Sequence, residues 1–257
     1  MKHKKTVLCV TGLVLTVIGV ALVYATRAAA LAEGASTAQT VPFALGLIVA
    51  LMGIVVWFVG LLPKRSPVNI RTMTTAALFA ALCYVGFTYC KLDIPVGTEK
   101  TAFHLGNVFC VLAALFLGGF WGGMAGAIGM TVADLTTAYV TSAPKTFLLK
   151  LGIGLITGLI AHRVFHISRD AERKVPISTA AVLSCVAGMS FNIIADPLVG
   201  YFYKMYVLGV PQQAADIWIK MGAVTTAVNA VIAMIVASIL YLAIRPSLKR
   251  ANLLPRL

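Results

Sequence analysis

The stretch that decides the fold runs from residue 103 to residue 160 and reads FHLGNVFCVLAALFLGGFWGGMAGAIGMTVADLTTAYVTSAPKTFLLKLGIGLITGLI. Its apolar runs are long enough to cross a lipid bilayer, and two opposite charges, Asp134 and Lys150, lie inside them. An ionisable side chain in such a place is costly and marks a functional site by default. We therefore look for the function of the protein around these two residues.

The composition excludes an ordinary soluble domain. Of the 257 residues, 60% are hydrophobic and 11% are charged, whereas a soluble domain carries about 25% charged residues. The formal net charge of +13 comes from short basic clusters between apolar runs, which is typical of cytoplasmic loops rather than of a nucleic-acid-binding surface. The five cysteines show neither a disulfide framework nor metal-ligand spacing. The sequence therefore predicts an all-α integral membrane protein with no cofactor and no nucleic-acid partner.

Eight apolar segments predict eight transmembrane helices, since about 20 residues span the hydrocarbon core. The linker from Pro63 to Pro67 carries two helix breakers and two positive charges, and it separates two N-terminal helices (residues 1–66) from a six-helix domain (residues 67–257). Residues 28–32 allow a cleaved signal peptide, but the long apolar run before them favours an uncleaved anchor. The predicted spans are 6–26, 42–62, 72–90, 104–117, 122–139, 146–165, 176–203 and 217–244, the fourth being short, tilted or irregular.

The distribution of positive charge predicts the orientation of the chain in the cell membrane. With the N-terminus in the cytoplasm, 14 Lys and Arg residues lie on the cytoplasmic side and six lie outside. Because cytoplasmic loops are enriched in Lys and Arg, both termini are expected inside. The loops 91–103, 140–145 and 204–216 are then expected to face outward.

Asp134 and Lys150 flank one of these outward turns. If the turn is centred near Ser142, each lies eight residues from it, at the same depth of roughly 8–12 Å. We expect the two side chains to meet. They form either a structural ion pair that locks two helices or the floor of an outward cavity that orients a polar ligand.

A second polar group is expected on the last two helices. Asn192 and Asp196 are four residues apart and share one helix face, with Pro197 predicted to kink the helix beside them. Asn229 on the last helix is placed to face them. These groups are either hydrogen-bonding contacts between helices or part of a ligand site. His104 and His162 have no companion at metal-ligand spacing.

Small residues predict close helix packing in two places. Overlapping GxxxG frames between Gly118 and Gly129, and again at Gly154 and Gly158, indicate tight helix–helix contact rather than a phosphate loop. A ridge in the third span is formed by Ala76, Ala77, Ala80 and Ala81. It predicts either a partner helix or an internal contact.

Several short motifs follow one another between about residues 70 and 245. After the Ala-rich helix and an outward loop with Pro95 come HLGN (104–107), LGGFWG (117–122), GAIG (126–129), ADL (133–135), Tyr139, PKTF (144–147), KLG (150–152) and GLI (158–160). This order resembles the substrate-binding S components of energy-coupling factor (ECF) vitamin transporters, in particular the riboflavin-type set. The two N-terminal helices depart from the six-helix pattern of that family.

The resemblance implies a domain that binds a water-soluble vitamin in a cavity open to the outside. It also implies association with a coupling transmembrane subunit and two ATPase subunits, and toppling in the lipid membrane to release the cargo inside. The AxxxA motif of the family matches Ala76/Ala80 or Ala77/Ala81, the expected coupling surface. The residues expected to bind substrate are His104, Asn107, Asp134, Tyr139, Lys150, Asn192, Asp196 and Asn229.

Other functions stay open at this point. A stand-alone secondary permease, driven by protonation of Asp134 or Lys150, and a membrane scaffold protein are the alternatives. An enzyme is disfavoured because no carboxylate pair with an adjacent base is present. Riboflavin is the ligand nearest to the resemblance, and pyridoxine, pantothenate or a thiamine precursor would also suit a site with few charges.

Overall fold

The computed structural model describes residues 2–30, 70–96, 99–251 and 254, together with residues 42, 45, 46, 49, 50, 53 and 56. The chain divides into two compact units. One consists of Met1–Leu61 with Phe202–Pro211, and the other of Leu62–Tyr201 with Gln212–Leu257.

The first unit is built on helix α1 (Lys2–Ala30). Gly19 and Gly53 mark its contact with the segment around residue 50, because a Cβ on Gly19 would lie 2.2 Å from the Ala50 nitrogen and one on Gly53 would lie 2.3 Å from the Thr16 nitrogen. Such spacing is possible only where two backbones touch. The predicted span 42–62 lies mostly outside the described residues. The short π-helix η3 (Tyr203–Val207) also belongs to this unit.

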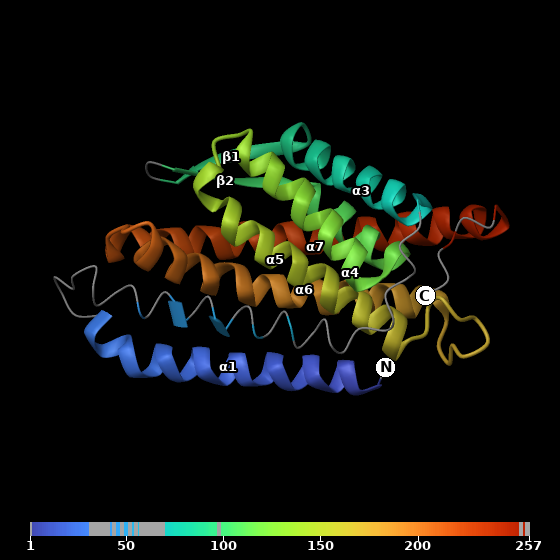
Figure 1. Ribbon diagram of the computed structural model, residues 1–257. Coiled ribbons are helices and arrows are strands. Elements are labelled where there is room, and N and C mark those ends of the chain that lie inside the picture. The colour runs from blue at the N-terminus through green and yellow to red at the C-terminus, as the bar shows by residue number, and fades with distance from the viewer. Residues whose placement is uncertain are drawn as a thin grey trace. The chain divides into compact units, whose positions relative to one another are not determined.

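Five long helices make up most of the second unit (Figure 1). They are α3 (Ile70–Thr88), α4 (Gly106–Leu135), α5 (Ala143–Leu159), α6 (Ile177–Phe202) and α7 (Gln212–Arg250), with η1 (Val140–Ser142) before α5 and η2 (Ile160–Val164) after it. With α1, the described residues contain six helices long and apolar enough to cross a membrane. This confirms the predicted class, a multi-pass helical membrane protein.

Gly118 divides α4 into two segments. Its φ of 80° and ψ of 170° are not helical, and φ in this range favours glycine. The second segment folds back along the first, because a Cβ on Gly122 would lie 2.3 Å from the Ala114 Cα and one on Gly126 would lie 2.2 Å from the Cys110 Sγ. The chain therefore turns back where the sequence predicted a break between spans 104–117 and 122–139.

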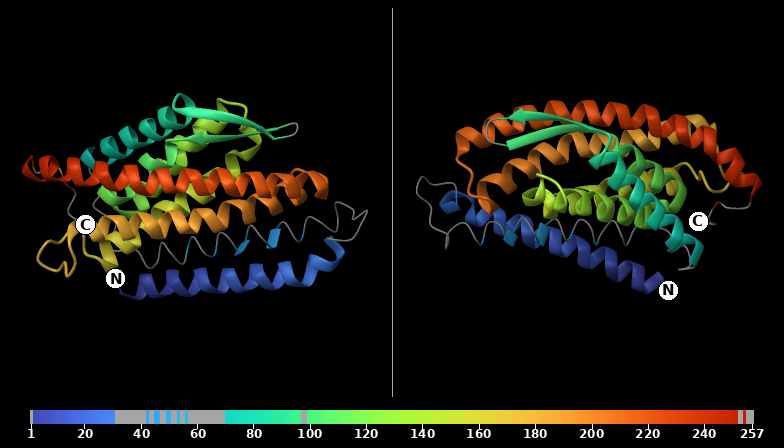
Figure 2. Two further views of the ribbon diagram at one scale, coloured as in Figure 1. Left: turned by 180° about the vertical axis from the view of Figure 1, so that it is seen from behind. Right: turned by 90° about the horizontal axis from the view of Figure 1, so that it is seen from above.

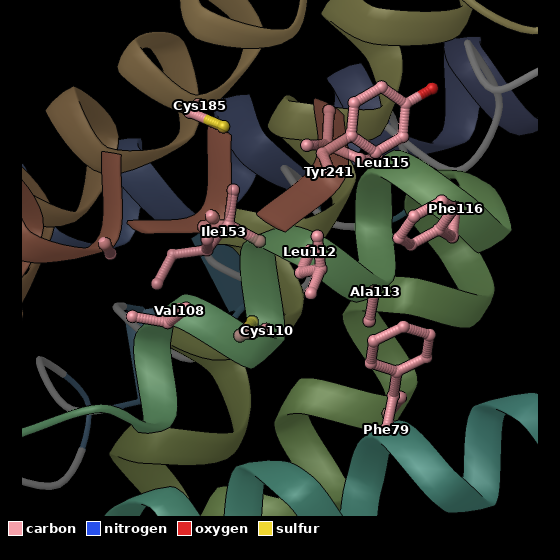
Figure 3. Packing of buried hydrophobic residues seen from close by; sticks show 14 of the residues in the cluster. Phe79, Val108, Cys110, Leu112, Ala113, Leu115, Phe116, Ile153, Cys185 and Tyr241 are labelled. Atoms are coloured by element: carbon pink, nitrogen blue, oxygen red, sulfur yellow. The ribbon is translucent and has the colours of Figure 1, made fainter. Parts of the chain in front are cut away.

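The core of the second unit surrounds the first segment of α4. Figure 3 shows Val108, Cys110, Leu112 and Phe116 from this segment among Phe79, Ile153, Cys185 and Tyr241 from four other helices. Packing against α5 is closest at glycines, since a Cβ on Gly154 would lie 2.2 Å from the Gly123 Cα and one on Gly158 would lie 2.1 Å from the Gly119 nitrogen. The glycine frames therefore serve helix packing, as predicted.

Two short strands form a hairpin in the segment 91–103, where the sequence predicted an outward loop. Strands β1 (Lys91–Val96) and β2 (Glu99–His104) pair antiparallel, from Lys91 opposite His104 to Val96 opposite Glu99. The alternation of Leu92, Ile94 and Val96 with Lys91, Asp93 and Pro95 was the available strand signal. The hairpin joins the end of α3 to the start of α4, so it lies at the predicted outer end of both helices.

Candidate functional site

Asp196 lies at the centre of a polar network that joins three helices. Its Oδ1 is 2.8 Å from the Lys145 Nζ, and its Oδ2 accepts a 2.6 Å hydrogen bond from the Thr226 Oγ1. Helices α6 and α7 run side by side where the second bond joins them (Figure 2). Sequence reasoning selected Asp196 but missed both partners. Thr226 lies one turn before Asn229 on α7, so the two residues share one face of that helix. This spacing was the available sequence signal for Thr226 as a partner of Asp196.

Asp134 and Lys150 do not form the direct ion pair that the sequence predicted. In the described part of the chain, no ion pair within 4.0 Å joins them. Thr146 lies beside the Asp134 carboxyl instead, so the reversal is centred about two residues before Ser142 and Lys150 lies one turn deeper, about 6 Å. The carboxylates of Asp196 and Asp134 both act electrostatically on Lys150.

The side chain of Lys150 is buried and has no close polar partner among the described residues. The residue is 7% exposed, and among the described residues no hydrogen bond or ion pair involves its ammonium group. Its own carbonyl oxygen lies 3.7 Å from the Cys110 Sγ, one turn beyond Asn107. This contact places the first segment of α4 against α5 at the depth of Lys150.

Four buried polar atoms on the elements around Lys150 have no hydrogen-bond partner among the described residues. They are the Nδ1 of His104, the Oδ1 of Asn107, the Oδ2 of Asp134 and the Oδ1 of Asn192. Asn107, Asp134 and Asn192 are only 2%, 2% and 1% exposed. An unsatisfied buried polar group costs about 1–3 kcal/mol, so each of these atoms would gain from a hydrogen bond to a bound molecule.

Asn229 holds the hairpin against α7. Its Oδ1 accepts a 2.9 Å hydrogen bond from the backbone N–H of His104, and its Nδ2 donates a 2.9 Å bond to the carbonyl oxygen of Ala102. The side-chain amide thus pairs with the free edge of β2 as a neighbouring strand would. The primary role of Asn229 in the structure is to position the hairpin.

An aromatic group lies beneath β1. The Phe87 ring is 4.7 Å from that of His104 and 5.5 Å from that of Tyr139, both edge-on. The Tyr139 hydroxyl donates a 2.9 Å hydrogen bond to the Asp93 Oδ1, and the Lys91 Nζ lies 5.1 Å from the Tyr139 ring centre. Burial, followed by this bond to Asp93, raises the pKa of Tyr139. Tyr139 is therefore a neutral donor that fastens the hairpin.

His104 connects the aromatic group to the charged residues. Burial, followed by the positive charge of Lys150, lowers the pKa of His104 from 6.5 to about 3. Asp196 and Lys91 also act on the imidazole electrostatically. The structure thus brings His104, Lys150 and Asp196 into one region, and His104 is neutral there.

The alanine ridge of α3 divides into a covered and an exposed pair. Ala76 is 9% exposed, and the Ala80 backbone touches α4, because a Cβ on Gly129 would lie 2.2 Å from the Ala80 carbonyl oxygen. Ala77 and Ala81 are exposed. Of the two frames that matched the AxxxA motif, Ala77/Ala81 is therefore the one available to a partner.

The geometry of these residues defines a class of protein. Unpartnered buried polar atoms, held between apolar membrane helices next to a docked hairpin, are typical of a membrane protein that binds a small polar molecule. In the described ranges no three His, Cys, Asp or Glu residues are grouped as a metal site.

Comparison with known families identifies the kind of binding protein. The model of the family described as ECF-type riboflavin transporter, S component, matches residues 67–246. The chain belongs to this family and is a membrane substrate-binding subunit of an ECF transporter, not an enzyme. Neither the curated proteins nor the solved structures that were compared contain a match.

Proposed function

We propose that this protein captures a water-soluble vitamin of the riboflavin type at the outer face of the cell membrane for uptake by an ECF transporter. The observation that carries the proposal is the group of buried polar atoms without partners at His104, Asn107, Asp134 and Asn192. A heterocycle with N–H or O–H donors would satisfy these acceptors, and it could accept a hydrogen bond from Lys150. Phe87 and His104 offer rings for stacking.

The eight predicted substrate-binding residues take two roles in this proposal. His104, Asn107, Asp134, Lys150 and Asn192 contact the ligand, since each has polar capacity that the protein leaves unused. Tyr139, Asp196 and Asn229 keep the site in shape, because their polar atoms already bind protein groups. The second group then affects affinity through the position of the hairpin and of α6.

The coupling surface is the exposed frame of α3. In the proposal, Ala77 and Ala81 receive a helix of a coupling transmembrane subunit, which two ATPase subunits energise. Small residues permit close backbone approach, and no large side chain at these two positions stands in the way. Behind this surface the Ala80 backbone contacts α4, and Ala76 is buried.

The proposed topology follows the charge distribution. Eight helices cross the membrane, two from residues 1–66 and six from residues 67–257, and α4 contributes two of the six through its reversal at Gly118. Both termini face the cytoplasm, where basic residues are enriched. The hairpin and the loop around Pro144 then face outward.

Ligand identity is tested directly on the purified full-length protein. Mass spectrometry of small molecules released on denaturation, followed by riboflavin titration monitored by quenching of flavin fluorescence, should detect a bound heterocycle. Asn192→Ala should weaken binding at least tenfold, because it removes a hydrogen bond worth about 0.5–1.5 kcal/mol and leaves the donor group of the ligand buried without a partner, which costs about 1–3 kcal/mol more.

The matched control lies on the same helix. Ser184 is fully buried and donates to the Ala180 carbonyl oxygen, so Ser184→Ala should leave affinity within about twofold. Equal losses in both variants would place the ligand elsewhere. Transport into liposomes that contain this protein alone would contradict the ECF mechanism and favour a stand-alone permease.

A further inference from the structure

The loop between η2 and α6 is fastened to the end of α7 by one carboxylate. Asp170 Oδ1 is 2.9 Å from the Arg245 Nη2, and the Asp170 carboxylate also pairs closely with Arg173 and Lys249. Arg245 donates a second bond of 3.3 Å to the carbonyl oxygen of Ile167. Three cations from two separate segments therefore meet at a single point.

The charges at this point do not balance. Hydrogen bonds from Lys249 and from the two arginines keep the pKa of Asp170 well below its usual range, so its single negative charge is permanent at neutral pH. Three positive charges against one leave a local excess of two. The other nearby carboxylate, Glu172, is already paired with Arg169, and the Nε of Arg245 has no partner in the described part of the chain.

The position of the cluster is fixed by helix length. Helix α7 has 39 residues, about 58 Å at 1.5 Å per residue, whereas the hydrocarbon core is about 30 Å thick. Its last turns, with Arg245 and Lys249, therefore extend past the hydrocarbon. The loop begins just after the apolar span Val140–Val164. Both segments place the cluster at the depth of lipid headgroups.

We propose that Arg173, Arg245 and Lys249 bind the phosphate of an anionic phospholipid at the membrane surface. The three side chains provide converging N–H donors and excess positive charge, the two properties that phosphate recognition requires. Lys249, whose side chain is 58% exposed, reaches the lipid first. Arg245, 12% exposed and anchored on Ile167, supplies the fixed donor. The site is separate from the vitamin-binding site and does not depend on its ligand.

The experiment compares two lipids on the full-length protein in detergent micelles. Native mass spectrometry counts bound phosphatidylglycerol and phosphatidylcholine of identical acyl chains, and thermal unfolding reports the stabilisation that each confers. We expect at least a tenfold preference for phosphatidylglycerol. Lys249→Gln should weaken its binding about fivefold, the contribution of one basic residue at an anionic surface.

Lys174→Gln is the matched control, because Lys174 is an exposed cation of the same loop with no ion pair within 4.0 Å among the described residues. It should change binding less than twofold. If Lys249→Gln does not fold, Arg173→Gln tests the same cluster from the loop side. Equal effects of the cluster and control variants, or no preference between the lipids, would overturn the proposal. Equal stabilisation by inorganic phosphate would show a site for free anions rather than for lipid.

Discussion

The Asp196 network offers the sharpest test of the site. Asp196→Asn keeps the shape of the side chain and its capacity to accept from Thr226, but it removes the charge that pairs with Lys145 at 2.8 Å. The two side chains are 17% and 23% exposed. Breaking a fully buried pair costs about 3–5 kcal/mol, whereas an exposed pair contributes about 0–1 kcal/mol.

At this intermediate exposure we expect a loss of about 2 kcal/mol in the free energy of unfolding. That is roughly a thirtyfold shift of the folding equilibrium, since about 1.4 kcal/mol corresponds to a factor of ten. The Lys145→Gln variant should lose a similar amount. Because both changes break the same contact, the double variant should be about 1–2 kcal/mol more stable than the sum of the single losses predicts.

Chemical unfolding in detergent, monitored by tryptophan fluorescence, measures all four proteins of the cycle. Lys145→Gln should also loosen α5 against α6 and weaken ligand binding through Lys150. A coupling energy below about 0.5 kcal/mol, the value for independent sites, would refute the reasoning. Asp196 would then be held by Thr226 alone, and the ion pair would contribute nothing to the site.

Three further experiments test Lys150, the alanine ridge of α3 and His104. Lys150→Met should weaken ligand binding tenfold or more, because hydrogen bonds to charged groups contribute about 1.5–3 kcal/mol. The same variant should not lower the free energy of unfolding, because it removes a buried amine that has no close partner among the described residues. A clear loss of stability would contradict this expectation. Ala77→Leu should block transport in the assembled complex and leave ligand binding intact. Ala80→Leu should instead lower the unfolding temperature of the isolated protein, because the Ala80 backbone contacts Gly129. The reverse pattern would show that Ala80 faces the partner and that Ala77 packs internally. His104 has a folded pKa of about 3, below its usual 6.5, so its neutral form favours the folded state, and stability should be full above about pH 6.5 and decline as the pH falls toward 3. A His104→Gln variant measured over the same pH range should lose part of that decline.

The membrane-spanning segments could be predicted from sequence because the bilayer acts on each segment separately. A run of about 20 apolar residues satisfies the hydrocarbon core whatever its neighbours are. The break between the predicted spans 104–117 and 122–139 follows from the same rule, and the structure places the reversal at Gly118 within it. Asp134, Lys150, Asn192 and Asp196 stood out for the same reason, as polar groups in places where each one alone is costly.

The hydrogen-bonding and ion-pair partners of these polar residues depend on the rotation and register of the helices. Neither can be predicted from the sequence of a single segment. A shift of about two residues in the reversal between α4 and α5 puts Thr146 beside Asp134, so Lys150 is left without a close partner. The Ala76/Ala80 and Ala77/Ala81 frames are equivalent in sequence, and only the packing of α3 on α4 decides which is covered.

Contacts between distant parts of the chain were also beyond sequence reasoning. The bonds from Asn229 to the hairpin span 125 and 127 residues, and no local pattern specifies such a pairing. The sequence alone determined which segments enter the membrane and which polar residues are costly there, because those energies are local. The tertiary structure decided which polar residues meet and which keep unused hydrogen-bonding capacity, because that depends on the rotation of several helices packed together.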